Sequence, residues 1–158
     1  MIQIDGSRGG GQLVRTALSL SAATGKPFTI KNARGQRKQS GLKPQHLAAI
    51  KALQQICDAD VEGAMSGSTE FSFSPRKIKG GTYTFDIGTA GSSTLLLQTI
   101  IPAAVHADAA TTVTILGGTD TKWCPPGMHM QHVLLPIVRK AGINVEMTVE
   151  KYGFYPKG

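Results

Sequence analysis

Residues 2–25 read IQIDGSRGGGQLVRTALSLSAATG, and this stretch sets a pattern that the rest of the chain repeats. The segment IQID predicts a short strand, GSRGGG predicts a turn, and the apolar run from Gln12 to Thr24 predicts a helix that ends at Gly25. The turn brings Arg8 and Arg15 close to the start of this helix. Unpaired backbone N–H groups at a helix start favour anions such as phosphate. A plain strand-to-helix turn is the alternative, and the sequence leaves both open.

Strands and helices alternate to the end of the chain. The expected strands are residues 2–5, 27–32, 60–65, 69–74, 82–88, 111–116 and 144–150, and the expected helices are residues 12–24, 45–57, 94–107 and 128–142. The pair Gln45-His46 recurs 86 positions later as Gln131-His132, and FTIKN recurs 85 positions later as VTILG. We predict an α+β fold of tandem βαβαββ units, residues 1–79 and residues 80–158, the second of them incomplete.

Two prolines and two cysteines add local expectations. Pro102 and Pro136 lie inside helical patterns and predict a kink or an early helix end. Cys57 and Cys124 are too few for a disulfide scaffold and lack the spacing of metal ligands. We therefore expect two reduced thiols, a cytoplasmic protein, and no zinc or iron–sulfur site.

The composition is that of a globular protein. Hydrophobic residues make up 41% of the 158 residues and charged residues 17%, which argues against a disordered chain. No apolar run is long enough to span a membrane, and the first residues lack the layout of a signal peptide.

The net charge of +7 is concentrated at one end of the sequence. Residues 6–57 contain nine Lys or Arg residues and no Asp or Glu. Such a block is typical of a protein that binds nucleic acid or polyphosphate, and a solvated basic surface is the alternative. The block contains only one aromatic residue, Phe28, so it offers no platform for stacking bases.

Five motifs occur in order: GGGQLVRTALSLS, RGQRKQSGLKPQHL, GTAGSSTLLLQTIIPA, GGTDTKWCPP and GFYP. With them the chain resembles the RNA 3'-terminal phosphate cyclases from its first strand to its last residue. Members of that family are roughly twice this length, so the resemblance covers their N-terminal half. It implies βαβαββ units arranged like those of the enolpyruvyl transferases and of one initiation-factor domain.

The resemblance also implies an ATP-dependent reaction with Mg²⁺ or Mn²⁺. A histidine of the enzyme is adenylated, AMP passes to the 3'-phosphate of an RNA, and the neighbouring 2'-hydroxyl displaces AMP to form a 2',3'-cyclic phosphate. The family's nucleophilic histidine belongs to a motif in the other half. We therefore expect no catalytic residue in this chain and no activity from it alone.

The motif match implies four residues that bind the RNA end and the nucleotide phosphates: Arg15, Arg34, Arg37 and Gln45. Arginine suits this role because its planar guanidinium binds two phosphate oxygens at once. Terminal phosphate carries about two charges at neutral pH, which must be neutralised before AMP can be attached. Solvated loop and surface charges are the alternative for the arginines.

For the nucleotide, the match implies Gln98, Pro125 and Pro126, the prolines beside the adenine. Gln98 is also the one strongly polar residue in TLLLQTIIPAAV, so it should face a partner or a cavity unless it is a satisfied core glutamine. A Pro-Pro pair alone signals only a stiff loop. The turn GTAGSS predicts either a second anion site or close packing of small residues.

Two departures from the family pattern bear on activity. The first turn is two residues shorter than usual, and Arg8 stands where a glutamate helps to hold the metal on ATP. Because a cation cannot ligate a metal, Arg8 argues against metal-dependent nucleotide binding. The other departure is Met128-His129, where the family has an acidic and an aromatic residue. His46 and His132 occupy equivalent repeat positions, which favours structural roles at helix starts.

The predicted function is that of an RNA 3'-terminal phosphate cyclase-like protein with RNA 3' ends and ATP as partners and no membrane. Either a homo-oligomer or a C-terminal half would complete the site. A non-catalytic RNA-binding relative in RNA processing or ribosome assembly is the main alternative. An enolpyruvyl transferase-like unit is a third, although the basic block is longer than a small substrate needs.

Overall fold

The computed structural model describes all 158 residues and has the predicted mixed α+β fold. The strands are β1 (Ile2–Asp5), β2 (Phe28–Lys31), β3 (Asp60–Glu62), β4 (Phe71–Ser74), β5 (Gly81–Asp86) and β6 (Thr111–Leu116). The helices are α1 (Gly11–Thr24), α2 (Pro44–Cys57), α3 (Ser93–Ala104), α4 (Gly127–His129), the π-helical turn η1 (Met130–Leu134) and α5 (Leu135–Lys140).

The first sheet has four strands in the order β1-β2-β4-β3. Strands β1 and β2 are parallel and joined by α1, whereas β4 runs antiparallel to both of its neighbours, with Phe73 opposite Phe28. The Phe28 ring centroid lies 5.7 Å from that of Phe71 and 5.9 Å from that of Phe73. The sequence TEFSFS alternates apolar and polar residues, and in β4 both phenylalanines are buried whereas Ser72 and Ser74 are half-buried.

The second sheet repeats the first part of this topology. Strands β5 and β6 are parallel, with Gly81 opposite Thr111, and α3 connects them as α1 connects β1 and β2. The segment α4-η1-α5 then follows β6 as α2 follows β2. The order of elements thus agrees with the internal repeat, while the division of the chain after residue 79 stays a prediction.

The strand predicted for residues 144–150 is wrong, since these residues form no ladder. The first sheet gives the physical reason: its third strand, β3, pairs only with β4, which lies between β2 and β3. No strand occupies the corresponding place beside β6, so residues 144–150 have no neighbour to pair with. A side-chain bond from Gln131 Nε2 to the carbonyl oxygen of Met147, 3.3 Å long, holds this segment against the helix.

Both prolines in helical patterns have the expected effect. Helix α3 ends at Ala104, two residues after Pro102 and before the predicted end at residue 107. The turn η1 widens to π-helical geometry immediately before Pro136, which has no N–H to donate to the preceding turn. Proline thus explains where the regular α-helix is interrupted in each case.

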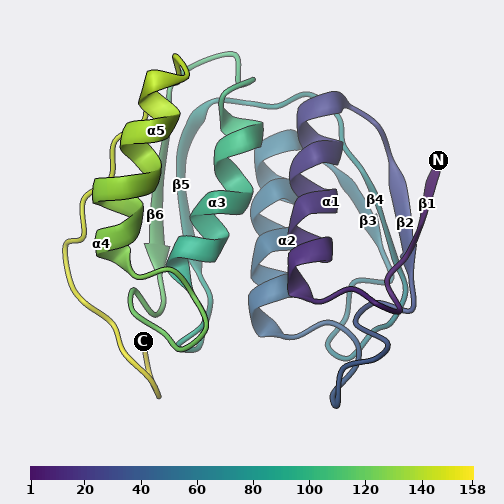
Figure 1. Cartoon of the computed structure of the whole chain (residues 1–158). Coiled ribbons are helices and arrows are strands. Elements are labelled where there is room, and N and C mark those ends of the chain that lie inside the picture. Colours follow the sequence, from purple (N-terminus) through teal and green to yellow (C-terminus); the bar gives the residue numbers. More distant parts are fainter.

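Figure 1 shows α1, α2 and α3 side by side in the middle of the molecule, with the four-stranded sheet on one side of them. The two-stranded sheet and α4-η1-α5 lie on the other side. Leu18, Leu53 and Ile100, one from each central helix, belong to a single core cluster of 24 buried residues. As its apolar sequence predicts, α3 has no exposed residue.

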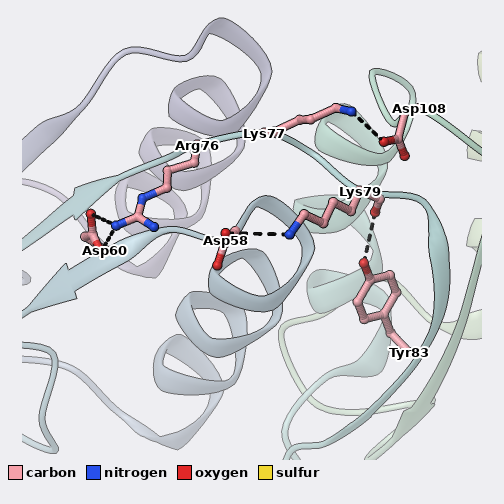
Figure 2. A network of polar contacts seen from close by, with 7 residues as sticks. All are labelled: Asp58, Asp60, Arg76, Lys77, Lys79, Tyr83 and Asp108. Carbon is pink, nitrogen blue, oxygen red and sulfur yellow. Dashed lines mark hydrogen bonds and ion pairs between the residues drawn. The ribbon is translucent and has the colours of Figure 1, made fainter.

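The connection between the sheets carries three cations that pair with acids on both sides of it (Figure 2). Arg76 Nη2 contacts Asp60 at 2.8 Å, Lys79 Nζ contacts Asp58 at 3.6 Å, and Lys77 Nζ contacts Asp108 at 3.0 Å. The Tyr83 hydroxyl donates to the carbonyl oxygen of Lys79, also drawn in Figure 2. All six charged side chains lie on the surface, so these ion pairs neutralise one another's charge but add little to the stability of the fold.

Both cysteines are free, as expected. Cys57 is buried and donates its thiol hydrogen to the carbonyl oxygen of Leu53, and burial raises the pKa of this thiol to about 12. None of the helices has the length and apolar character needed to cross a membrane.

Candidate functional site

The N-termini of α1, α2 and α3 lie at one end of the molecule, the lower end in Figure 1. Gly11 begins α1 and touches His46 in the first turn of α2. The Cβ of Gln45 in turn lies 3.4 Å from the place where a Cβ would stand on Gly91, just before α3. The loop of residues 33–43, called the basic loop here, carries Arg34, Arg37, Lys38 and Lys43 of the charge block. It reaches the same end, so the charge block and the helix starts converge.

Two consecutive glycines at the start of α1 allow polar side chains to approach the backbone closely. A Cβ on Gly11 would collide with His46 Nε2 and lie 3.2 Å from Arg15 Nη1. A Cβ on Gly10 would lie 2.8 Å from Arg37 Nη2. Any side chain here would therefore displace a hydrogen-bond donor. We call Gly10, Gly11, Arg15, Arg37 and His46 the helix-mouth cluster.

The helix-mouth cluster contains hydrogen-bond donors and positive charges but no acidic side chain. No hydrogen bond uses the backbone N–H of Gly10, Gly11 or Gln12, and the first turn of α1 has no acidic residue. Neither Arg15 nor Arg37 forms a salt bridge. The salt bridges of the protein are formed by three lysines and Arg76, which lie elsewhere. Unpaired N–H groups, the positive end of the α1 dipole and two guanidinium groups together favour an anion.

His46 supplies a donor that carries no charge. Its side chain is only 1% exposed, and Nδ1 accepts a hydrogen bond from the backbone N–H of Lys43 at 3.0 Å. In the neutral ring the proton is then on Nε2, which has no partner. Burial, followed by the charges of Arg34, Arg15 and Lys43, lowers the pKa of His46 to about 4. The ring is therefore a neutral donor at pH 7, aimed at the mouth of α1.

Arg34 is hydrogen-bonded to the backbone of its own loop. Its Nη1 donates to the carbonyl oxygens of Gln39 and Gly41, at 3.0 and 2.6 Å, and closes the basic loop on itself. Burial and the charge of Arg37 lower the pKa of its guanidinium. The structure thus places Arg34 as the anchor of the loop that carries Arg37, and its direct contact with phosphate stays a prediction.

Arg15 also lines a hollow of about 200 Å³ between α1 and α3. Gln98 lies in the same hollow, where its Nε2 donates to Met130 Sδ at 3.3 Å. This agrees with the expectation that Gln98 faces a cavity. A larger hollow, of about 520 Å³, lies between α2 and residues 61–66, but it includes no residue of the helix-mouth cluster.

The proline pair of GGTDTKWCPP contacts the start of α3 through the backbone carbonyl of Pro125. Thr94, at the start of α3, donates a hydrogen bond to the carbonyl oxygen of Pro125 at 2.7 Å. Cys124 lies close enough to Arg15 for its charge to raise the pKa of that guanidinium, against the larger lowering by burial. Pro126 caps α4 and is exposed. The loop therefore lies beside the hollow that holds Arg15 and Gln98.

The turn GTAGSS is explained by packing. The Ser92 hydroxyl caps α3 by accepting from the N–H of Leu95 at 3.2 Å. Gly118 lies so close to the turn that a Cβ on it would stand 2.7 Å from the carbonyl oxygen of Ala90. Of the two readings of this turn, the structure supports close packing of small residues.

The residues present do not fit a magnesium or manganese ion. No three His, Cys, Asp or Glu side chains come together in a way that could hold a metal. Arg8 is exposed in the turn before α1, where its charge helps to lower the pKa of Asp5, mainly lowered by hydrogen bonds from Ser7. The mouth of α1 is therefore lined by cations where a metal would need carboxylates.

The structure brings the predicted residues Arg15, Arg37 and Gln45 to the same end of the molecule, and their contact with a ligand stays a prediction. The sequence did not identify His46 as a donor. The repeat favoured a structural role for this histidine, and its Nδ1 has that role at the start of α2. The other ring nitrogen, Nε2, is the donor that faces the start of α1. Two consecutive glycines opposite a Pro-Gln-His helix start were the one signal in the sequence for so close an approach.

Comparison with known proteins gives one consistent result. A family model described as RNA 3'-terminal phosphate cyclase matches residues 7–158. A Methanosarcina acetivorans protein of that name is 50% identical over 160 residues, which cover 100% of this chain and 45% of the relative. An Ectopseudomonas mendocina protein of the same name is 48% identical over 157 residues, 99% of this chain and 46% of the relative. The chain thus spans about half the length of the curated relatives it matches.

The neutral state of His46 predicts how stability depends on pH. The unfolded chain takes up a proton near pH 6.5, whereas folded His46 stays neutral down to about pH 4. Acid in this range therefore favours the unfolded chain. Between pH 7 and pH 4.5 we expect the free energy of unfolding to fall by about 2 kcal/mol through this group. Urea unfolding at the two pH values measures it.

In His46→Gln this loss should be absent, because the amide can accept from the N–H of Lys43 and does not titrate. His106→Gln is the matched control, since His106 is exposed, and it should keep the wild-type pH dependence. The lowered pKa values of Asp5 and Asp108 act at lower pH and are common to all three proteins. An equal loss of stability in wild type and His46→Gln would contradict the assignment.

Proposed function

The chain belongs to the RNA 3'-terminal phosphate cyclase family, and on this premise we propose that its helix-mouth cluster binds the terminal 3'-phosphate of an RNA. The single observation that carries the proposal is the convergence of Arg15, Arg37 and His46 Nε2 on the glycine backbone at the start of α1. Every group there is a donor, and none is an acid.

A terminal phosphate fits this arrangement better than a phosphate inside an RNA chain. The terminal group carries up to two negative charges at neutral pH and has three free oxygens, whereas an internal phosphodiester has one charge and two. Arg15 and Arg37 can each offer a fork of two N–H donors, and the α1 backbone offers further N–H groups. His46 adds a hydrogen bond without adding repulsion between cations.

The surrounding charge supports an RNA ligand. The cations near α1 and in the basic loop have no acidic partner, whereas those of the connection between the sheets are paired. The paired Asp58 caps the far end of α2, roughly 18 Å from His46 at 1.5 Å per residue of helix. Arg15, Arg37 and the basic loop thus place unpaired positive charge at the helix-mouth end, where it would attract the rest of the RNA backbone.

For the nucleotide we propose the hollow between α1 and α3, with Gln98 and the loop of Pro125 and Pro126 around it. Arg15 would then lie between the nucleotide and the RNA phosphate, since it belongs to both the hollow and the helix-mouth cluster. Gln45 stands at the edge toward α3 and would contact the RNA end. The order matches the reaction that the resemblance implies, in which AMP is attached to the 3'-phosphate.

A non-catalytic role in RNA binding is favoured for these residues taken alone. The one histidine in the site, His46, carries its proton on Nε2 and uses Nδ1 as an acceptor, so neither nitrogen is free to attack ATP. His106, His129 and His132 are exposed, and no hydrogen bond or ion pair orients their side chains. Arg8 and the lack of a metal-binding group point the same way.

Replacing Arg37 with alanine tests the phosphate site. Loss of a charge-assisted hydrogen-bonding group costs about 1.5–3 kcal/mol, so we expect RNA with a 3'-phosphate to bind about ten- to a hundred-fold more weakly. RNA with a 3'-hydroxyl should change little, and the preference for the phosphate should disappear. Fluorescence anisotropy with the two matched RNAs measures this.

Lys26→Ala is the matched control, because it removes one exposed positive charge beyond the C-terminal end of α1. It should keep the preference for 3'-phosphate. The proposal is wrong if the wild-type protein binds both RNAs equally, or if Arg37→Ala still prefers the phosphate.

Residues 1–158 should form no covalent adenylate, since no histidine here is activated as a nucleophile. Incubation with ATP labelled in the α-phosphate, in the presence of magnesium or manganese, should leave the protein unlabelled on a denaturing gel. A full-length relative, such as the Methanosarcina acetivorans protein, serves as the positive control. A labelled band at the mass of this chain would contradict the non-catalytic role, and mapping the label would identify the residue.

A further inference from the structure

Trp123 is the single tryptophan of the chain and its most exposed large hydrophobic residue, with 89% of its surface accessible. It lies in the loop between β6 and α4. A ring exposed to this degree is accessible to a ligand. Nothing in the proposed phosphate site uses it.

The backbone holds Trp123 in an unusual conformation. Its φ is +69°, in the left-handed region that side chains other than glycine rarely adopt. The N–H of Cys124 donates to the carbonyl oxygen of Thr121 at 3.2 Å and closes the turn that carries the ring. Strained residues held in this way cluster at functional sites, because the surrounding structure must compensate their cost.

The loop places the ring next to the proposed ligand site. Cys124, the following residue, lies close enough to Arg15 to influence its pKa, and the carbonyl oxygen of Pro125 accepts a hydrogen bond from Thr94 at the start of α3. Trp123 therefore belongs to a loop that contacts the start of α3 and lies near Arg15 of the helix-mouth cluster. No residue of the basic block can take its place, since the one aromatic there, Phe28, is buried.

A cation accompanies the ring. Lys122 Nζ lies 5.3 Å from the centroid of the indole, within the range of a cation–π contact. A positive charge beside an open aromatic face is the combination that binds nucleotides without regard to sequence, by attracting the phosphate and stacking the base. The same charge disfavours a purely apolar protein partner.

We propose that Trp123 stacks on a nucleobase held at the rim of the helix-mouth cluster, with Lys122 beside it to attract the phosphate of the same ligand. The inference rests on the proposed function for the placement of the ligand. Two sources offer the same chemistry: the last nucleotide of an RNA with a 3'-phosphate, and the adenine of ATP.

Because Trp123 is the only tryptophan, its fluorescence reports on this one ring. One arm titrates the protein with a short RNA ending in adenosine 3'-phosphate and with the same RNA lacking the terminal base. The other arm uses AMP and ribose 5-phosphate. We expect quenching by the base-containing member of at least one pair and little by its base-free partner, and the arm that responds identifies the source.

Variants separate stacking from general binding. Trp123→Leu should weaken binding of the base-containing ligand about ten-fold and leave the base-free ligand unchanged, whereas Trp123→Phe should retain most of the affinity. Anisotropy of labelled RNA gives the affinities independently of the tryptophan. Rescue by Phe and not by Leu would be specific to an aromatic face.

Three outcomes would overturn the inference. If RNA binds by anisotropy but neither arm quenches Trp123, stacking is wrong while the phosphate site stands. If the emission of the free protein is blue-shifted in proportion to protein concentration, a second copy covers the ring. If RNA with a 3'-phosphate shows no binding at all, the proposed function fails and the stacking site fails with it.

Discussion

The close approach of His46 and two arginines to a glycine backbone is the constraint on which the functional end of the molecule depends. A Cβ on Gly11 would collide with His46 Nε2, and one on Gly10 would crowd Arg37. These glycines therefore do more than form a turn between a strand and a helix. They bring the first N–H groups of α1 and three side-chain donors into one place, where His46 Nε2 is buried without a hydrogen-bond partner.

The fold supplies this meeting point because its helices are parallel. In each βαβ segment the helix returns the chain to the start of a parallel strand, so α1 and α3 begin at the same end as the carboxyl ends of β1 and β5. The start of α2 lies between them, because His46 contacts Gly11 at the start of α1 and Gln45 contacts Gly91 before α3. Three acids, Asp58, Asp60 and Asp108, lie instead at the opposite end, where they pair with the connection between the sheets (Figure 2). The first turns of α1, α2 and α3 contain no acidic residue.

Most of the fold could be predicted from periodicity and turns, but features that depend on a distant partner could not. The strand at residues 111–116 was predicted with its observed bounds. The strand predicted at residues 144–150 does not form, because it has no neighbouring strand, and the local sequence pattern does not show this. The motif match implied phosphate roles for Arg34 and Arg37, and both roles stay predictions. The bonds of Arg34 to Gln39 and Gly41 could not be predicted, since they arise from the shape of the loop. The donor role of His46 depends on an approach between two helices.

The most direct test of this account is the ¹⁵N spectrum of the His46 imidazole at pH 7, with and without a ribonucleoside 3'-monophosphate. The account predicts a proton on Nε2 and none on Nδ1 in the free protein. It also predicts that the ligand shifts Nε2 together with the backbone amides of Gly10 and Gly11. A proton on Nδ1, or ligand-induced shifts confined to other parts of the chain, would contradict it.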